Sequence, residues 1–130
     1  MTPRSLVLLA DDDDLLQAVV EYKLVAAGYD VVCLDDGRAV LEHIGRLSPA
    51  VVVLDAMMPI MDGFEVLRRL KSDVELKVIP VMMLTALRRD SDILTALNLG
   101  AADYLPKPFN PNELIARLAR LAPPIRKFAR

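Results

Sequence analysis

The hydrophobic pattern of the chain consists of five short apolar runs, each followed by a stretch in which apolar residues recur at helical spacing. A short run without polar alternation is typical of a strand that is buried on both faces, as in a parallel sheet. The runs predict strands at Leu6–Leu9, Asp30–Leu34, Val51–Leu54, within Val78–Leu84 beginning after Pro80, and at Asp103–Leu105.

Apolar residues at steps of three and four predict a helix after each strand. The last helix has the clearest start signal, with Asn110 as its cap, Pro111 at the first helical position and Glu113 three residues after the cap. We interpret Asp62-Gly63 as a turn. The helices are predicted from Leu15 to Gly28 with Asp13 or Asp14 as cap, at Arg38–Leu47, at Phe64–Lys71, from about Asp90 to Leu99 with Asp90 or Ser91 as cap, and from Pro111 until Pro123-Pro124.

Strict alternation of strand and helix predicts an α/β domain, in which right-handed crossovers build a parallel sheet with five helices on both faces. At this length we expect the doubly wound, flavodoxin-like strand order 2-1-3-4-5. Pro106 fits that order, because it removes a ladder donor and the last strand lies at an edge. We expect one domain over residues 1–122, with residues 123–130 forming a tail or the start of a linker to an output domain.

Composition narrows the class of protein. With 54% apolar and 26% charged residues, the 130-residue chain is expected to be globular. The net charge of −2 argues against direct nucleic-acid binding, and no apolar run reaches the roughly 18 residues that a membrane span needs. Cys33, the only cysteine, fits a reducing cytoplasm and is expected to be a small buried hydrophobe. We interpret His43 as a surface histidine rather than a phosphate carrier.

Polar residues that could form one site follow the first, third, fourth and fifth predicted strands. Asp11 and Asp12 come after the first, Asp55 ends the third, Thr85 follows the fourth, and Lys107 comes shortly after the fifth. Ligands of open α/β sheets bind at the carboxyl ends of the strands, so these side chains should converge there. Crowded carboxylates favour a cation, and an all-oxygen site suits Mg²⁺ with a phosphate oxygen as an additional ligand. An aspartate can itself accept a phosphoryl group.

From roughly Leu6 to Leu121, the chain resembles the receiver domain of two-component response regulators. The resemblance rests on Asp11-Asp12, on Leu54-Asp55-Ala56-Met57-Met58-Pro59-Ile60-Met61-Asp62-Gly63, on Thr85-Ala86 and on Lys107-Pro108-Phe109. The Ala101-Ala102-Asp103-Tyr104 stretch and the last helix are most similar to the subgroup that dimerises and is often linked to a winged-helix domain.

The resemblance implies a phosphorylation-activated switch. Asp55 would accept a phosphoryl group from a sensor histidine kinase, a phosphotransfer protein or a small phosphodonor. Asp11, Asp12, Asp55 and the backbone carbonyl of Met57 would hold Mg²⁺, with Mn²⁺ as a substitute, and Lys107 would contact the phosphoryl oxygens. The only reactions that the chain would catalyse are its own phosphorylation and dephosphorylation.

The resemblance also implies how the switch works. Thr85 would shift toward the phosphorylated aspartate, and the rotamer of Tyr104 would follow. That movement would alter the face built by the helix Asp90–Leu99, the strand Asp103–Leu105 and the helix that begins at Pro111. The Lys107–Pro108 bond is expected to be cis.

Two apolar residues depart from what the family often shows. Met57 and Leu87 cannot orient a water molecule, so we expect slow self-dephosphorylation. Glu113 and Arg117 fit the dimerising subgroup, but the fourth helix lacks the basic residues of a complete ion-pair set, so we expect at most a weak homodimer without phosphate.

Two other functions stay open at this point. A phosphatase of the haloacid-dehalogenase type would also use an aspartate after the first strand, which would make Asp11 the nucleophile. A receiver-like binding module that is never phosphorylated is the second alternative.

Overall fold

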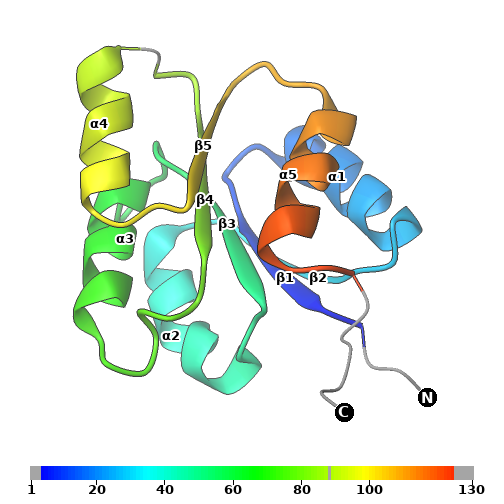
Figure 1. Ribbon diagram of the computed structural model, residues 1–130, viewed down its shortest axis with the longest axis horizontal. Coiled ribbons are helices and arrows are strands. Elements are labelled where there is room, and N and C mark those ends of the chain that lie inside the picture. The colour runs from blue at the N-terminus through cyan, green and yellow to red at the C-terminus, as the bar shows by residue number, and fades with distance from the viewer. Residues whose placement is uncertain (1–3, 88, 125–130) are drawn as a thin grey trace.

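A five-stranded parallel sheet lies between two layers of helices in the computed structural model, which describes residues 4–87 and 89–124 (Figure 1). The strands are β1 (Leu6–Ala10), β2 (Asp30–Leu34), β3 (Val51–Asp55), β4 (Val81–Thr85) and β5 (Asp103–Pro106). The helices are α1 (Asp14–Ala26), α2 (Gly37–Leu47), α3 (Gly63–Ser72), α4 (Asp90–Asn98) and α5 (Pro111–Leu121). All four strand pairs are parallel and the order is β2-β1-β3-β4-β5, so the predicted fold class is confirmed.

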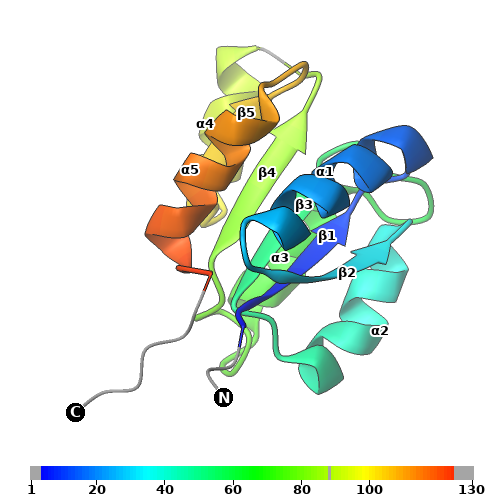
Figure 2. The same cartoon turned by 90° about the vertical axis from the view of Figure 1, so that its right-hand side faces the viewer.

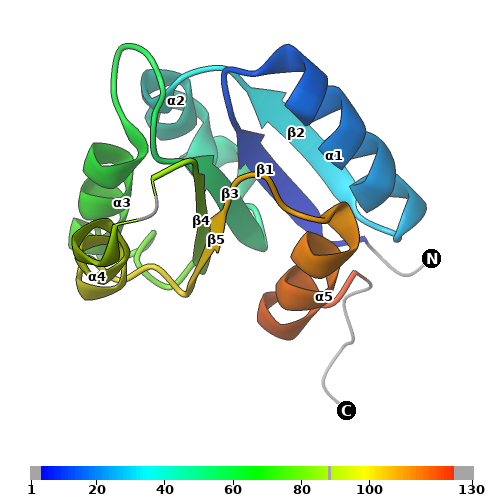
Figure 3. The same cartoon turned by 90° about the horizontal axis from the view of Figure 1, so that it is seen from above.

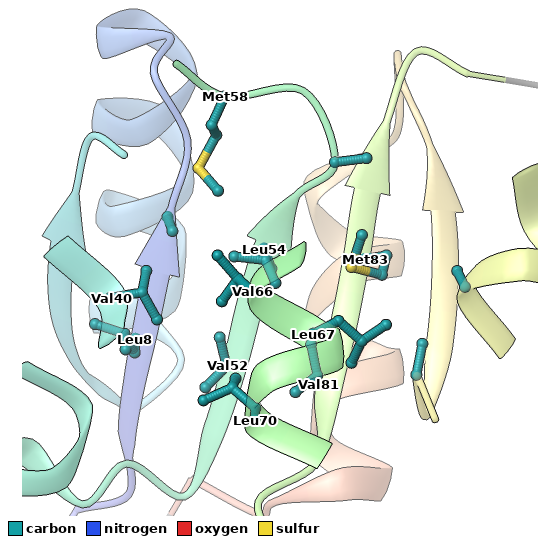
Figure 4. Close-up of a cluster of buried hydrophobic side chains, with 14 of the residues drawn as sticks. Leu8, Val40, Val52, Leu54, Met58, Val66, Leu67, Leu70, Val81 and Met83 are labelled. Atoms are coloured by element: carbon teal, nitrogen blue, oxygen red, sulfur yellow. The ribbon is translucent and has the colours of Figure 1, made fainter. Parts of the chain in front are cut away.

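The helices divide between the two faces of the sheet. Helices α1 and α5 cover one face, and α2, α3 and α4 cover the other (Figure 1, Figure 3). Because successive strand residues point to opposite faces, Val53 packs beneath α1 and α5 whereas Val52 and Leu54 pack beneath α2 and α3. Figure 4 shows the hydrophobic cluster on the α2 and α3 side of the sheet, in which Leu67 and Leu70 of α3 lie against the strands.

Burial along the strands follows their place in the sheet. Every residue of β3 and β4 is buried, as the unbroken apolar runs predict. The edge strand β2 is only partly covered, so Cys33 is half-buried against the core rather than buried as predicted. Partial burial and the nearby carboxylate of Glu21 still raise the pKa of the Cys33 thiol to about 11, which keeps it uncharged.

Short polar side chains begin most of the helices. Side-chain oxygens that accept backbone N–H groups come from Asp13 at α1, Asp36 at α2, Asp62 at α3 and Asn110 at α5. The Asp62-Gly63 pair therefore begins a helix, where we had expected a turn. Helix α4 lies where it was predicted, but its predicted cap is wrong, because the cap is Arg89, which makes no side-chain capping bond to the described residues. Asp90 lies in the first turn instead, where its charge favours the helix dipole.

The residues that follow α5 lie beside the start of β1. Ser5 donates from its backbone nitrogen to the carbonyl of Pro124 at 2.8 Å and from its hydroxyl to the carbonyl of Pro123 at 2.6 Å. The buried Tyr29 hydroxyl donates to the carbonyl of Ala122 at 2.7 Å. The rest of the expected tail, residues 125–130, lies outside the described residues.

Candidate functional site

The carboxyl ends of the strands gather four of the predicted site residues at one edge of the sheet. Asp11 directly follows β1, Asp55 and Thr85 are the last residues of β3 and β4, and Lys107 directly follows β5. Figure 2 shows these strand ends at the same edge. Asp11, Asp55 and Thr85 are almost completely buried, with exposed fractions of 0%, 3% and 0%. Polar side chains buried to this extent require partners, so their contacts define the site.

Lys107 joins the two buried carboxylates. Its Nζ lies 2.7 Å from Oδ2 of Asp11 and 3.3 Å from Oδ2 of Asp55. Burial alone would lower the pKa of Lys107, but the hydrogen bonds and charges of Asp11 and Asp55 outweigh it and the pKa is raised. The lysine therefore remains an ammonium ion that draws the ends of β1, β3 and β5 together.

The carboxyl group of Asp55 has a raised pKa. Burial raises the pKa of its carboxyl group, and the negative charge of Asp11 raises it further. The hydrogen bond from the Met57 backbone nitrogen, at 3.1 Å to Oδ1, and the charge of Lys107 act in the opposite direction but do not cancel the shift. A carboxylate in this position gains from any further positive charge placed beside it.

Three carboxylates could hold a metal ion here. One oxygen from each of Asp11, Asp12 and Asp55 lies within 4.8 Å of the others. Asp12 is exposed while the other two are buried, so the cluster opens to solvent on the Asp12 side. Three carboxyl groups gather beside the ammonium of Lys107, and this oxygen donor set fits a hard divalent cation such as Mg²⁺ that keeps several waters. The Met57 carbonyl as a further ligand remains a prediction.

Gly63 allows the loop after Asp55 to fold back on the site. A side-chain carbon at Gly63 would collide with the backbone carbonyl of Asp55, and the Gly63 nitrogen donates to the carbonyl of Ala56 at 2.9 Å. Gly37 plays a matching role, because a side chain there would collide with the carbonyl of Met61. The Asp-Gly pair was visible in the sequence, but only the backbone contacts show that a larger residue would displace the loop.

Thr85 and Tyr104 meet through the backbone of Leu87. Oγ1 of Thr85 accepts the Leu87 backbone nitrogen at 3.1 Å, and the Tyr104 hydroxyl donates to the Leu87 carbonyl at 2.7 Å. Tyr104 is buried, and burial followed by the charge of Asp92 raises the pKa of its hydroxyl. The sequence predicts a role for the side chain of Leu87, whereas the contacts in the structure are made by its backbone nitrogen and carbonyl. Met57, by contrast, is largely exposed beside the site.

The sequence matches the response regulator receiver domain over residues 7–119. The chain belongs to the receiver domains of two-component response regulators. It is 43% identical over 112 residues to a protein of Porphyridium aerugineum named "Probable transcriptional regulator ycf27", covering 86% of this chain and 45% of that protein. It is 38% identical over 112 residues to the transcriptional regulatory protein PhoP of alkaline phosphatase synthesis in Bacillus subtilis, covering 86% and 46% of the two chains.

Solved structures support the same family. The chemotaxis response regulator CheY4 of Vibrio cholerae matches this receiver domain with a TM-score of 0.85 at 32% identity, covering 92% of this chain and 99% of that one. The chain spans about half the length of the curated relatives it matches. Within the described residues of the receiver domain, no helix is both long and apolar enough to cross a membrane.

Proposed function

We propose that this receiver domain is a phosphorylation-controlled switch with Asp55 as its phosphoryl acceptor. The observation that carries the proposal is the position of Lys107, whose ammonium bridges Asp11 and Asp55 at 2.7 and 3.3 Å beside a third carboxylate. A phosphoryl group on Asp55 would meet this ammonium on one side and the carboxylate cluster on the other. Transfer of so highly charged a group depends mainly on such positioning and electrostatic stabilisation.

Asp55 is better placed than Asp11 to be the nucleophile. Both oxygens of each carboxylate have a partner, but those of Asp11 are held more tightly, with Oδ1 accepting the Asp13 nitrogen at 2.9 Å and Oδ2 held by Lys107 at 2.7 Å. The contact between Asp55 and Lys107 is looser, at 3.3 Å. The haloacid-dehalogenase alternative receives no support from the family match. The other alternative is a receiver-like binding module that is never phosphorylated. Labelling of the wild-type protein by acetyl phosphate, described below, would exclude it.

Each residue of the site has a defined task in the transfer. An oxygen of Asp55 attacks phosphorus while the bond to the donor atom breaks, and the departing donor takes the electron pair of that bond. Bound Mg²⁺, with Mn²⁺ as a substitute, would neutralise charge on the phosphoryl oxygens. Asp11 and Asp12 would hold the ion, and Lys107 would move from Asp55 to the phosphoryl group.

The response to phosphate is proposed to pass through Leu87. A phosphoryl group on Asp55 offers acceptor oxygens to the Thr85 hydroxyl, whose oxygen accepts the Leu87 nitrogen and which also contacts the Tyr104 hydroxyl in the unphosphorylated domain. Rotation of Thr85 would break that bond and loosen the peptide that the buried Tyr104 holds through the Leu87 carbonyl. The signal would thereby reach the face formed by α4, β5 and α5.

We expect only a weak homodimer through this α4-β5-α5 face, because charged residues on the face are already paired within one chain. Arg117 already bonds Asp103 at 3.0 Å and Glu113 at 2.9 Å within one chain. Pairing across a dimer would exchange these bonds for equivalent ones, with little net gain for exposed groups. Leu94 and Leu97 of α4 are exposed and supply apolar area for the contact.

The surface of α1 fits a helical partner such as a sensor histidine kinase or phosphotransfer protein. Leu15 and Tyr22 are 75% and 72% exposed, and Val19 between them is also exposed. The spacing places these apolar side chains on one side of a helix that starts beside the carboxylates. A hollow of about 340 Å³ opens next to Lys107, between Leu16 and Phe109, and leads partner groups toward the site. We further propose that phosphoryl transfer from the partner takes place in the cytoplasm, because a single cysteine fits a reducing compartment. The domain itself is proposed to make no direct contact with nucleic acid, in line with its net charge of −2.

Phosphorylation by acetyl phosphate tests the proposal. Purified wild-type protein should gain one phosphoryl group in the presence of Mg²⁺ and none with a chelator, as measured by intact-protein mass spectrometry. Asp55→Asn should gain none, while Asp30→Asn, which changes an exposed aspartate at the start of β2, should behave as wild type. Equal labelling of Asp55→Asn and wild type, or no labelling of either, would overturn the assignment.

A further inference from the structure

Gln17 of α1 is bonded to three oxygen atoms beside the carboxylate cluster. Its Nε2 carries two hydrogens and lies within donating distance of three oxygens, so one hydrogen is shared; the three are the backbone carbonyl of Asp11, the carbonyl of Leu34 at 2.9 Å and Oδ1 of Asp35 at 3.0 Å. Because all three partners can only accept, the amide nitrogen rather than the amide oxygen must face them. A single half-buried side chain thus ties α1 to the ends of both β1 and β2.

The hydrogen bond from Gln17 to the Asp11 carbonyl fixes the peptide group between Asp11 and Asp12. On the far side of that peptide, the Asp13 nitrogen donates to Oδ1 of Asp11 at 2.9 Å, and the Asp13 carboxylate caps α1. The loop is therefore fixed after Asp12 by Asp13 and before it by Gln17. The exposed carboxylate of Asp12 projects from between these two fixed points.

We propose that Gln17 is a positioning residue for the divalent cation, because it holds the Asp11–Asp12 peptide so that the Asp12 carboxylate faces Asp55. The inference rests on the proposed function, since a loop held in this way matters only if the cluster binds a cation. Gln17 does not touch the ion. It holds the Asp11–Asp12 loop in one conformation before the cation binds. Without this hydrogen bond, the loop would lose conformational entropy on binding, and that loss would weaken the affinity for the cation.

The test compares two methionine substitutions on the same helix. Gln17→Met keeps the length of the side chain and removes its donor, whereas Ala18→Met adds the same side chain at the next, exposed position. Mg²⁺ affinity is measured by isothermal titration calorimetry, and amide hydrogen exchange of residues 12–14 is measured in chelator-treated, metal-free protein. Gln17→Asn, which retains the amide but is one methylene too short, serves as a second and more conservative variant.

We expect Gln17→Met and Gln17→Asn to raise the Mg²⁺ dissociation constant roughly tenfold. The amides of residues 12–14 should exchange faster in both variants, with Ala18→Met unchanged in both measurements. Wild-type affinity in the Gln17 variants, or an equal loss in Ala18→Met, would overturn the inference. Failure of the wild type itself to bind Mg²⁺ would instead contradict the proposed function, and the exchange rates of the metal-free protein would then decide separately whether Gln17 orders the loop.

Discussion

Replacing Asp55 with asparagine is expected to stabilise the folded domain while abolishing phosphorylation. The buried carboxylate of Asp55 has a raised pKa, which means that the fold disfavours its charged form. Asparagine keeps the shape and can still accept the Met57 nitrogen, which lies 3.1 Å from Oδ1 of Asp55. The substitution therefore removes a charge without leaving that donor unpaired.

The contacts of Asp55 set the size of the effect. At an effective dielectric constant of about 20, attraction across the 3.3 Å between Lys107 Nζ and Asp55 Oδ2 amounts to about 5 kcal/mol. Repulsion from Asp11, whose oxygen lies within 4.8 Å, removes about 3.5 kcal/mol of this, and Asp12 removes more. The net electrostatic attraction that remains for the Asp55 carboxylate is smaller than the several kcal/mol that burial of a carboxylate costs. We expect Asp55→Asn to gain about 1–2 kcal/mol, and roughly 4–8 °C in melting temperature.

The pH dependence gives this prediction a second readout. Since the folded-state pKa of Asp55 lies above its unfolded value, the destabilisation is fully present above the folded-state pKa. It disappears as the pH falls through that value and below the unfolded value of about 4. The advantage of Asp55→Asn should therefore be largest above the folded-state pKa of Asp55 and be lost in acid. Saturating Mg²⁺ should reduce it as well, because the ion compensates the wild-type carboxylate.

Urea unfolding followed by far-ultraviolet circular dichroism measures the effect in chelator-treated protein across this pH range. Asp30→Asn, at an exposed position, serves as the control and should change the free energy of unfolding by less than about 0.5 kcal/mol. A loss of stability in Asp55→Asn at neutral pH, or a gain that persists unchanged in acid, would show that burial does not disfavour the charged form of Asp55.

Three further substitutions test the neighbouring contacts. Lys107→Met leaves the two buried carboxylates without their ammonium, which lies 2.7 and 3.3 Å from them, and should lower the free energy of unfolding by about 2–3 kcal/mol at neutral pH in urea titrations. Tyr104→Phe loses the 2.7 Å bond to the Leu87 carbonyl and should cost about 1 kcal/mol, with phosphorylation of the acceptor retained. Met57→Asn places an amide beside the site where it can orient water, so the phosphoryl group should be lost several-fold faster; an unchanged lifetime in a phosphate-release assay would contradict the role of that position.

Much of the fold could be predicted because the strands are strongly patterned. The runs that became β3 and β4 are apolar without interruption, and both lie buried in the centre of the sheet. The prediction for Cys33 was wrong because β2 has the same type of sequence but lies at an edge, where its faces are only partly covered. The cap of α4 was missed because an acidic residue near a helix start can serve in the first turn as well as at the cap.

The candidate site could be predicted where its residues directly follow strands, as Asp11, Asp55 and Lys107 do. Their convergence follows from topology alone. The contributions of Gln17 and of the Leu87 backbone could not be predicted. A glutamine in the first turns of a helix has no characteristic pattern, and peptide groups carry no sequence signal. Such contacts depend on how loops pack across the sheet edge, which only the structure shows.

Reductive mapping of the phosphorylated residue shows whether Asp55 is the phosphoryl acceptor. Borohydride converts an aspartyl phosphate into homoserine, and tandem mass spectrometry locates the converted residue after treatment with acetyl phosphate and Mg²⁺. We expect homoserine at position 55 in wild-type protein and nowhere in Asp55→Asn. Homoserine at position 11, or none at all in protein that binds Mg²⁺, would contradict it.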